Sequence, residues 1–173
     1  MQFSIHALLA LTASAALAAC NPTFNWRDVR PEGTRLSLLM PCKPDKAQKT
    51  VPMAGQPIQL MLLSCDAGGL TFAVAVMDVS DASKVATTLS QWQSATLANM
   101  KAAPAPLSSP IKLAGLANSG VVVKVTGQRA NGQAVSSQAA YFAQGSQVFQ
   151  AVIYADKISP DAADTFFSGL KFD

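Results

Sequence analysis

The fold is decided by the stretch Ile58-Gln-Leu-Met-Leu-Leu-Ser-Cys-Asp-Ala-Gly-Gly-Leu-Thr-Phe-Ala-Val-Ala-Val-Met77. Two apolar runs, over residues 58–65 and 71–77, flank the turn Asp66-Ala-Gly-Gly69. Adjacent glycines supply the positive φ angles that a hairpin turn needs, so the stretch predicts two antiparallel strands. Apolar residues occupy both faces of these runs, which predicts a central strand that is covered on both sides.

A helix is expected after this hairpin, from Ser80-Asp81 to about Lys101. Ser and Asp are favoured capping residues because their side chains accept hydrogen bonds from the first free N–H groups of a helix. Residues at steps of four and three form one apolar stripe, namely Val85, Leu89, Trp92, Thr96 and Met100. Prolines within residues 102–110 end the helix.

The second half of the chain predicts a meander of hairpins. Strands are expected over residues 111–116, 120–126, 134–142 and 148–154, and Asn131-Gly132 is a strong turn signal. A final helix is expected after Ser159, because Pro160 suits the first helical position and Asp161 favours the helix dipole. Its buried stripe is expected to comprise Ala163, Phe166, Phe167 and Leu170.

Upstream of the hairpin, residues 35–41 predict a first strand and residues 48–53 a short edge strand. The chain therefore contains strands, a helix, antiparallel strands and a second helix. This order predicts an α+β fold, in which one twisted antiparallel sheet carries one long and one C-terminal helix. Residues 34–173 are expected to form this single domain.

The tetrapeptide Leu17-Ala-Ala-Cys20 closes an apolar run over residues 5–19 and resembles a bacterial lipobox. The run is shorter than the roughly 20 residues of a membrane-spanning helix, and it suits a secretory signal. The first six residues depart from the signal pattern, since they contain no Lys or Arg. The resemblance implies a signal peptide over residues 1–19 and lipidation of Cys20. With Asn21 next, it implies an anchor at the periplasmic face of the outer membrane.

Residues 20–33 are expected to form the lipidated N-terminus and a tether with a reach of about 20 Å. Phe24 and Trp26 are expected to dock on the domain or at the lipid interface. The net charge of +3 is too small to indicate a nucleic-acid partner. Six basic residues near the tether either contact anionic lipid or form a plain solvated surface, namely Arg27, Arg30, Arg35, Lys43, Lys46 and Lys49.

The chain contains three cysteines. If Cys20 is lipidated, Cys42 and Cys65 remain as a pair in an oxidising compartment, and we expect a disulfide between them. Two free thiols or a metal-binding pair are the alternatives. A metal-binding pair lacks the further Cys or His ligands that would complete the site.

Two segments resemble the PsbP/Mog1-like superfamily: Phe166-Phe-Ser-Gly-Leu-Lys-Phe172 after the meander, and the opening strand that runs into Pro41-Cys-Lys-Pro44. The segment from Phe24-Asn-Trp-Arg27 to Cys65-Asp-Ala-Gly-Gly69 is similar to a group of uncharacterised proteobacterial envelope proteins. Because PsbP-like proteins are often accessory subunits of larger assemblies, the resemblance implies a role in binding a partner. It transfers no catalytic residue.

Residue types that support catalysis are scarce. His6, the only histidine, lies in the expected signal peptide, and Glu32, the only glutamate, lies in the tether. We therefore expect no catalytic residue, no cofactor and no metal site. A Ser/Lys hydrolase is an alternative, because Ser109-Pro-Ile-Lys112 and Ser168-Gly-Leu-Lys171 match the S-x-x-K pattern.

Two further groups of residues have structural explanations. Six aspartates fall mostly at turns and helix starts, where capping and solubility explain them, namely Asp66, Asp78, Asp81, Asp156, Asp161 and Asp164. Four methionines raise the alternative of Cu(I) binding, although methionine also fills gaps in a core. They are Met40, Met53, Met61 and Met77.

Three functions are compatible with these patterns. The first is a lipid-anchored, non-catalytic envelope protein that binds or assists another envelope component through an exposed apolar patch or a free sheet edge. The second is a carrier of a small apolar or lipidic ligand, with a closed apolar pocket between the sheet and the helix of residues 85–100. The third is the Ser/Lys hydrolase. The sequence leaves the oligomeric state open.

Overall fold

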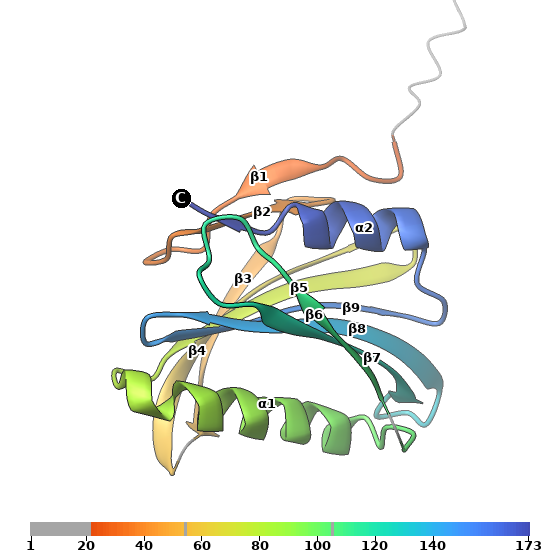
Figure 1. Ribbon diagram of the computed structural model, residues 1–173. Helices are drawn as coiled ribbons and strands as arrows, with labels where there is room; N and C mark the ends of the chain where they lie inside the picture. Colours follow the sequence, from red (N-terminus) through yellow and green to blue (C-terminus); the bar gives the residue numbers. More distant parts are fainter. Residues whose placement is uncertain (1–21, 54, 105) are drawn as a thin grey trace, which may run out of the picture.

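We describe the protein from a computed structural model. The structure describes residues 22–53, 55–104 and 106–173, so the lipobox and His6 lie outside the described residues. Three layers make up the described part (Figure 1). Helix α1 lies on one side of a seven-stranded antiparallel sheet, and helix α2 with a small three-stranded sheet lies on the other side.

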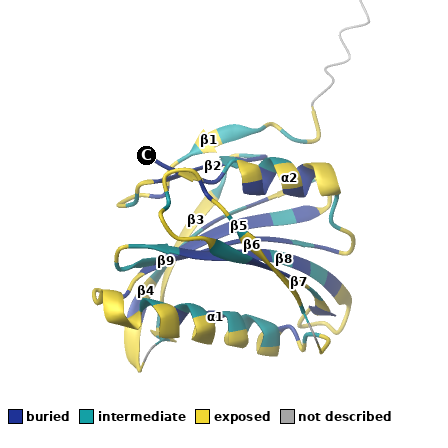
Figure 2. Cartoon of the chain, viewed as in Figure 1, coloured by how far each residue is buried: buried dark blue, intermediate teal, exposed yellow. Residues whose placement is uncertain are grey.

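The large sheet has the strand order β3-β4-β5-β9-β8-β7-β6. Its strands are β3 (Asp45–Met53), β4 (Gln56–Ala67), β5 (Leu70–Asp78), β6 (Leu107–Ile111), β7 (Gly120–Gln128), β8 (Ala134–Gln144) and β9 (Gln147–Ala155). The predicted hairpin forms β4 and β5, and Gly68 and Gly69 adopt the positive φ angles of 59° and 75° that its turn needs. β5 is buried along nearly its whole length (Figure 2), which confirms the prediction of a central, doubly covered strand.

Helix α1 (Val85–Asn99) covers one face of this sheet and has 15 residues. It follows the single 3-10 turn η1 (Ala82–Lys84), where the Asp81 carboxylate accepts a hydrogen bond from the backbone N–H of Ser83 at 2.9 Å. Asp81 therefore caps the 3-10 turn and not α1 itself, which begins at Val85, after Lys84, without a side-chain cap. Trp92 from the predicted stripe is buried in the core between α1 and the sheet.

Helix α2 (Pro160–Ser168) and the small sheet cover the other face. The Ser159 hydroxyl accepts from the backbone N–H of Ala162, as expected for a capping residue, and the four residues of the predicted stripe are buried. Aromatic rings fill this core. The Phe72 and Phe166 rings lie 5.3 Å apart, between their centroids, and the Phe142 ring stacks on Phe149 at 5.2 Å.

The small sheet corrects the expectation of one sheet. It consists of β1 (Arg27–Val29), β2 (Leu36–Met40) and β10 (Lys171–Phe172), in the order β1-β2-β10. The predicted first strand is β2, whose Leu36, Leu38 and Met40 have no exposed surface. This strand lies across the large sheet as a covering layer and does not extend that sheet.

Two further differences concern the second half of the chain. α2 is not the last element, because β10 follows it and pairs with β2. β6 occupies residues 107–111, where a proline-rich break was expected. An edge strand tolerates Pro110, since a proline whose missing N–H points to solvent removes no bond from the ladder.

The expected tether also differs from the structure where residues 22–33 are described. β1 pairs with β2, and the backbone N–H of Asn25 donates to the Pro41 carbonyl at 2.8 Å. The ring centroids of Phe24 and Trp26 lie 6.2 and 5.9 Å from that of Phe72. Of the two docking places expected for these rings, the structure shows the domain.

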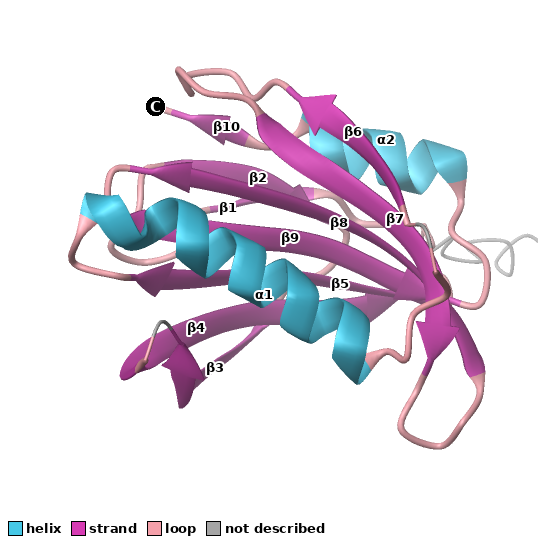
Figure 3. Ribbon diagram, turned by 60° about the horizontal axis from the view of Figure 1, so that its bottom comes forward, coloured by secondary structure: helices cyan, strands magenta, loops and turns pink. Residues whose placement is uncertain are grey.

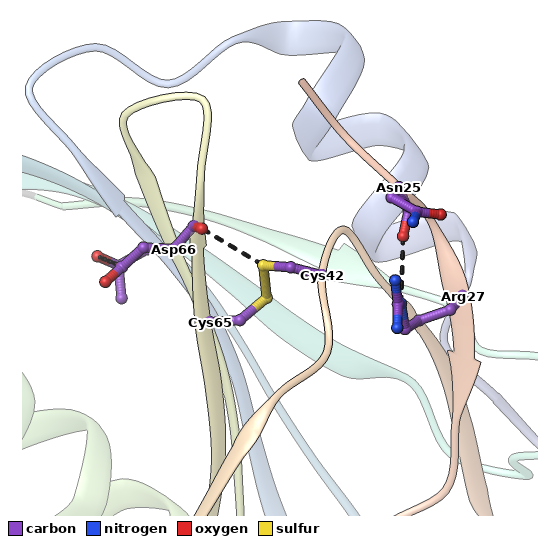
Figure 4. Close-up of a disulfide and its surroundings, with 6 residues drawn as sticks. Asn25, Arg27, Cys42, Cys65 and Asp66 are labelled. Carbon is purple, nitrogen blue, oxygen red and sulfur yellow. Dashed lines mark hydrogen bonds between the residues drawn. A yellow bond between two sulfur atoms is a disulfide. The ribbon is translucent and has the colours of Figure 1, made fainter. Parts of the chain in front are cut away.

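The predicted disulfide between Cys42 and Cys65 is present, with the two Cα atoms 6.1 Å apart. It ties the segment after β2 to β4 and so links the small sheet to the large one (Figure 4). The main-chain oxygen of Asp66 lies 3.4 Å from the Cys42 sulfur. Within the described ranges, no helix is long and apolar enough to cross a membrane.

Candidate functional site

A groove of about 550 Å³ lies between strands β6 to β8 and the start of α2, and we call it the β6–α2 groove. The strand register builds one of its walls. Lys124 lies opposite Leu107 and Gln138, and Thr126 lies opposite Ser136. Directly opposed residues share one face of a sheet, so these side chains point to the same side. The other wall comes from the loop before α2 and from its first turn.

The β6–α2 groove combines apolar and charged groups. Leu107 is 73% exposed, and it is the single large hydrophobic residue with such exposure in the described part of the chain. Arg129 Nη2 donates to the Asp156 carboxylate at 3.0 Å. The ion pairs of the described residues leave Lys124 and Lys157 without a carboxylate partner. The groove therefore offers apolar contact, two lysines and the carboxylate of Asp164 to a bound segment.

Hydroxyl groups line part of the β6–α2 groove. The Ser136 hydroxyl donates to the Asp156 carbonyl at 3.3 Å, and this contact gives it no base that could accept its proton. A nucleophilic serine needs a general base within hydrogen-bond reach. Among the residues described as lining the groove, there is no cysteine or histidine.

A second groove, of about 460 Å³, lies between α1 and β7, and we call it the α1–β7 groove. Its lining mixes apolar residues such as Leu89 and Val121 with polar residues such as Ser90, Gln93 and Asn118. The carrier hypothesis predicted a closed apolar pocket between this helix and the sheet. The structure shows a groove with a mixed lining at that place.

A buried polar network links α1 to the sheet. The Gln150 side-chain amide donates to the Tyr141 hydroxyl at 2.9 Å and to the Thr96 hydroxyl at 3.1 Å. Burial raises the pKa of Tyr154 to about 12, with a smaller contribution from the neighbouring Tyr141, while a hydrogen bond with Ser137 opposes the shift. Tyr154 therefore stays neutral at physiological pH.

Burial also raises the pKa of Tyr141, against the effect of its hydrogen bonds to Thr96 and Gln150. The sequence placed Thr96 in the buried stripe of α1 but did not single out Gln150. A polar residue that alternates with Phe149 and Ala151 in an apolar strand was the available signal, because such a residue must find a buried partner.

The structure separates the residues of both S-x-x-K matches from the geometry that this motif needs. Ser109 lies in strand β6 and not at a helix start, and Lys112 follows the strand; both are exposed. Ser168 is the last residue of α2, where its hydroxyl donates to the Thr165 carbonyl at 3.4 Å. Lys171 belongs to β10.

The aspartates occupy capping and turn positions. Asp78 accepts hydrogen bonds from the Ser80 backbone N–H at 2.8 Å and from the Ser146 hydroxyl at 2.8 Å, and Asp66 accepts from the Thr71 hydroxyl at 2.6 Å. Of the basic residues near the chain start, Lys46 pairs with Glu32 at 2.6 Å and Arg30 pairs with Asp173.

The four methionines do not gather into one site. Met40 and Met77 are buried in two different cores on opposite faces of the sheet, and Met53 and Met61 are partly buried. No group of three or more His, Cys, Asp or Glu side chains with metal-binding geometry occurs among the described residues.

Comparisons with known proteins add little. Neither a protein-family model nor a curated protein matches the sequence. A crystal structure of a Bacteroides thetaiotaomicron protein is similar at 13% identity and a TM-score of 0.48, and it covers 80% of this chain. The match spans 45% of the Bacteroides protein, so the chain corresponds to less than half of its length.

A crystal structure of a Pseudomonas aeruginosa protein, described as being of unknown function, is similar at 13% identity and a TM-score of 0.33. The match covers 79% of this chain and 84% of the other. At these scores, neither likeness establishes a shared fold or indicates a function.

Proposed function

We propose that the protein is a lipid-anchored, non-catalytic component of the bacterial cell envelope that binds or assists another envelope component. The observation that carries this proposal is the Cys42–Cys65 disulfide. Disulfides persist in oxidising compartments such as the periplasm and are rare in the cytosol of most bacteria. The bond therefore supports export, and export agrees with the lipobox resemblance at Cys20.

The packing of the chain start limits the distance between the proposed lipid anchor and the domain. Phe24 is held by its contacts with Trp26 and Phe72, so the chain is fixed from this residue onward. Phe24 lies four residue steps after Cys20, and a fully extended chain covers at most about 14 Å over that length. A lipid on Cys20 would hold the domain against the outer membrane on its periplasmic side.

The proposed binding surface is the β6–α2 groove. Its exposed Leu107 and its unpaired Lys124 and Lys157 can contact an extended segment of a partner that carries both apolar and acidic side chains. Exposed apolar surface beside polar groups is typical of interaction sites. The PsbP/Mog1-like resemblance supports the same role, and the α2 helix after the strand meander is compatible with that resemblance.

The anchor is tested by fractionating cells that produce the full chain. The wild-type protein is expected in the outer-membrane fraction, and Cys20→Ser is expected in the soluble periplasmic fraction, because the substitution removes the thiol that would carry the lipid. A Cys20→Ser protein that stays in the membrane would remove the lipoprotein proposal.

The groove is tested by native mass spectrometry of the protein extracted from its own membranes. We expect a second protein to be extracted with the wild type and to be lost with Lys124→Ala. Lys171→Ala is the matched control, since Lys171 is an exposed lysine outside the groove. Equal retention of the partner by both variants would show that the groove is not the contact.

A second candidate function is the carrier of a small ligand, which the α1–β7 groove favours. The same mass spectra distinguish it from the first. A small mass that stays with the protein and is lost on Leu89→Asp, but not on Lys124→Ala, would support the carrier and place the ligand beside α1.

A further inference from the structure

The two edges of the large sheet differ in length and in sequence. β3 forms one edge with 9 residues, and β6 forms the other with 5 (Figure 3). Every residue of β3 from Asp45 to Thr50 is exposed. An exposed edge strand presents unpaired N–H and C=O groups, which can pair with a strand of another molecule.

The register shows which β3 groups point outward. Pro52 lies directly opposite Pro57 in the β3–β4 ladder. In an antiparallel ladder, opposed residues alternately exchange two hydrogen bonds or none, and two prolines cannot exchange any. Every second pair from Pro52 is therefore a pair without hydrogen bonds. Lys46, Gln48 and Thr50 belong to these pairs, so their N–H and C=O groups point away from β4.

The β6 edge is protected by proline. Pro110 lies opposite Val121 and has no N–H, so the outward positions of β6 are Ser108 and Pro110. Only Ser108 can donate a hydrogen bond outward, and Pro106 precedes the strand. Proline thus leaves one outward donor on the β6 edge, whereas β3 has three consecutive outward positions between Pro44 and Pro52.

The side chains of β3 leave this edge clear. The Lys46 ammonium is held by Glu32 at 2.6 Å, and the Thr50 hydroxyl accepts from the Gln59 amide at 2.9 Å. Lysine on an edge strand usually discourages pairing. Here the Lys46 charge is neutralised within the chain, so it opposes the approach of a second strand less.

We propose that two copies of this chain associate through antiparallel pairing of their β3 strands, with Gln48 opposite Gln48 of the second copy. In this register Lys46 of each copy lies opposite Thr50 of the other copy. The three pairs can exchange two hydrogen bonds each, six in all. The arrangement has twofold symmetry, as most homodimers do.

Charge complementarity supports a second copy as the occupant. On the other face of the strand, Lys49 lies opposite Ala47 of the second copy, with Asp45 of that copy at one diagonal and Lys49 at the other. Diagonal neighbours are about 7–8 Å apart between Cα atoms, within reach of a lysine side chain. No like charges are directly opposed in this register. The association depends on the β3 edge alone and not on the proposed lipid anchor or groove.

Cysteine substitution tests the register in cells that produce the full chain. Gln48→Cys is expected to form a disulfide-linked dimer on a non-reducing gel, because a hydrogen-bonded pair has Cα atoms about 5.5 Å apart. Thr50→Cys is the matched control. Its two copies would lie four residues apart along the strands, about 14 Å, which is too far for a disulfide.

Lys46→Cys and Thr50→Cys are expected to cross-link when they are produced together, and Ser108→Cys on the β6 edge is expected to stay monomeric. A Gln48→Cys protein that stays monomeric, or a dimer that forms equally from Thr50→Cys, would overturn the proposal.

Gln48→Pro gives a second test that does not rely on a new thiol. The Gln48 N–H points away from β4, so proline removes no bond within the monomer but removes two of the six bonds between copies. For the detergent-extracted full chain, sedimentation is expected to show a wild-type dimer and at least a tenfold weaker association of Gln48→Pro. An intact Cys42–Cys65 bond in the variant would show that it folds. A monomeric wild type, or unchanged association of Gln48→Pro, contradicts the proposal.

Discussion

Tyr154 is a single residue whose ionisation reports on the contact between α1 and the sheet. Burial raises its pKa from the ordinary 10.0 to about 12, so the folded state holds the phenol proton more tightly than the unfolded state does. The stabilisation that this provides is complete below about pH 10 and is lost as the pH rises through about 12. The loss amounts to about 3 kcal/mol of unfolding free energy.

We predict that the phenolate absorbance of Tyr154, taken as the difference between the wild type and Tyr154→Phe, stays low at pH 10 and rises near pH 12. Tyr154→Phe is expected to flatten the decline of the unfolding free energy over this range. The absorbance that remains in Tyr154→Phe comes from Tyr141, the other tyrosine of the chain. An absorbance midpoint for both tyrosines at the ordinary value would contradict the burial of the network.

Thr88 illustrates a second effect at the scale of one residue. Thr88 belongs to α1 and is fully buried. Its hydroxyl has no hydrogen-bond partner among the described residues. A buried hydroxyl without a partner costs about 1–3 kcal/mol. Thr88→Val is therefore expected to raise the free energy of unfolding by about 1 kcal/mol in urea denaturation, whereas Thr87→Val on the exposed side of the helix is expected to change it little. A destabilised Thr88→Val would indicate that water or another group satisfies the hydroxyl.

At the scale of elements, α2 depends on its cap. The Ser159 hydroxyl accepts from the backbone N–H of Ala162, and such caps contribute about 1 kcal/mol. We expect Ser159→Ala to lower the unfolding free energy by about that amount. Ser168→Ala, at the other end of the same helix, is expected to leave it within about 0.5 kcal/mol. Equal effects of the two substitutions would argue against capping.

Most elements of the large sheet were predictable from the sequence, because their strands are apolar and bounded by turn residues. The hairpin of residues 58–77 and the Asn131-Gly132 turn are examples, and Ser159 with Pro160 located the start of α2. β3 was predicted too short, since its exposed first half has no apolar alternation. β6 was missed for the same reason, and β1 and β10 are too short to give a period.

At the scale of the whole molecule, the second sheet and the grooves could not be predicted from the sequence. β2 is apolar on both faces, so its pattern is equally compatible with a central strand and with a covering layer. The β6–α2 groove gathers Leu107, Lys124 and Asp156 from segments far apart in the chain, and only the strand register brings them together. The disulfide was predictable, because the chain has three cysteines and only Cys42 and Cys65 remain if Cys20 is lipidated.

The central proposal, a lipid-anchored envelope protein with an oxidised cysteine pair, is tested most directly by one measurement. This measurement is the intact mass of the protein extracted from the membranes of cells that produce the full chain, before and after reduction. The proposal predicts a chain that begins at Cys20, carries the mass of a diacylglyceryl group and an acyl chain, and gains two hydrogen masses when the Cys42–Cys65 bond is reduced. An unmodified chain that retains its first residues and shows no change on reduction would contradict it.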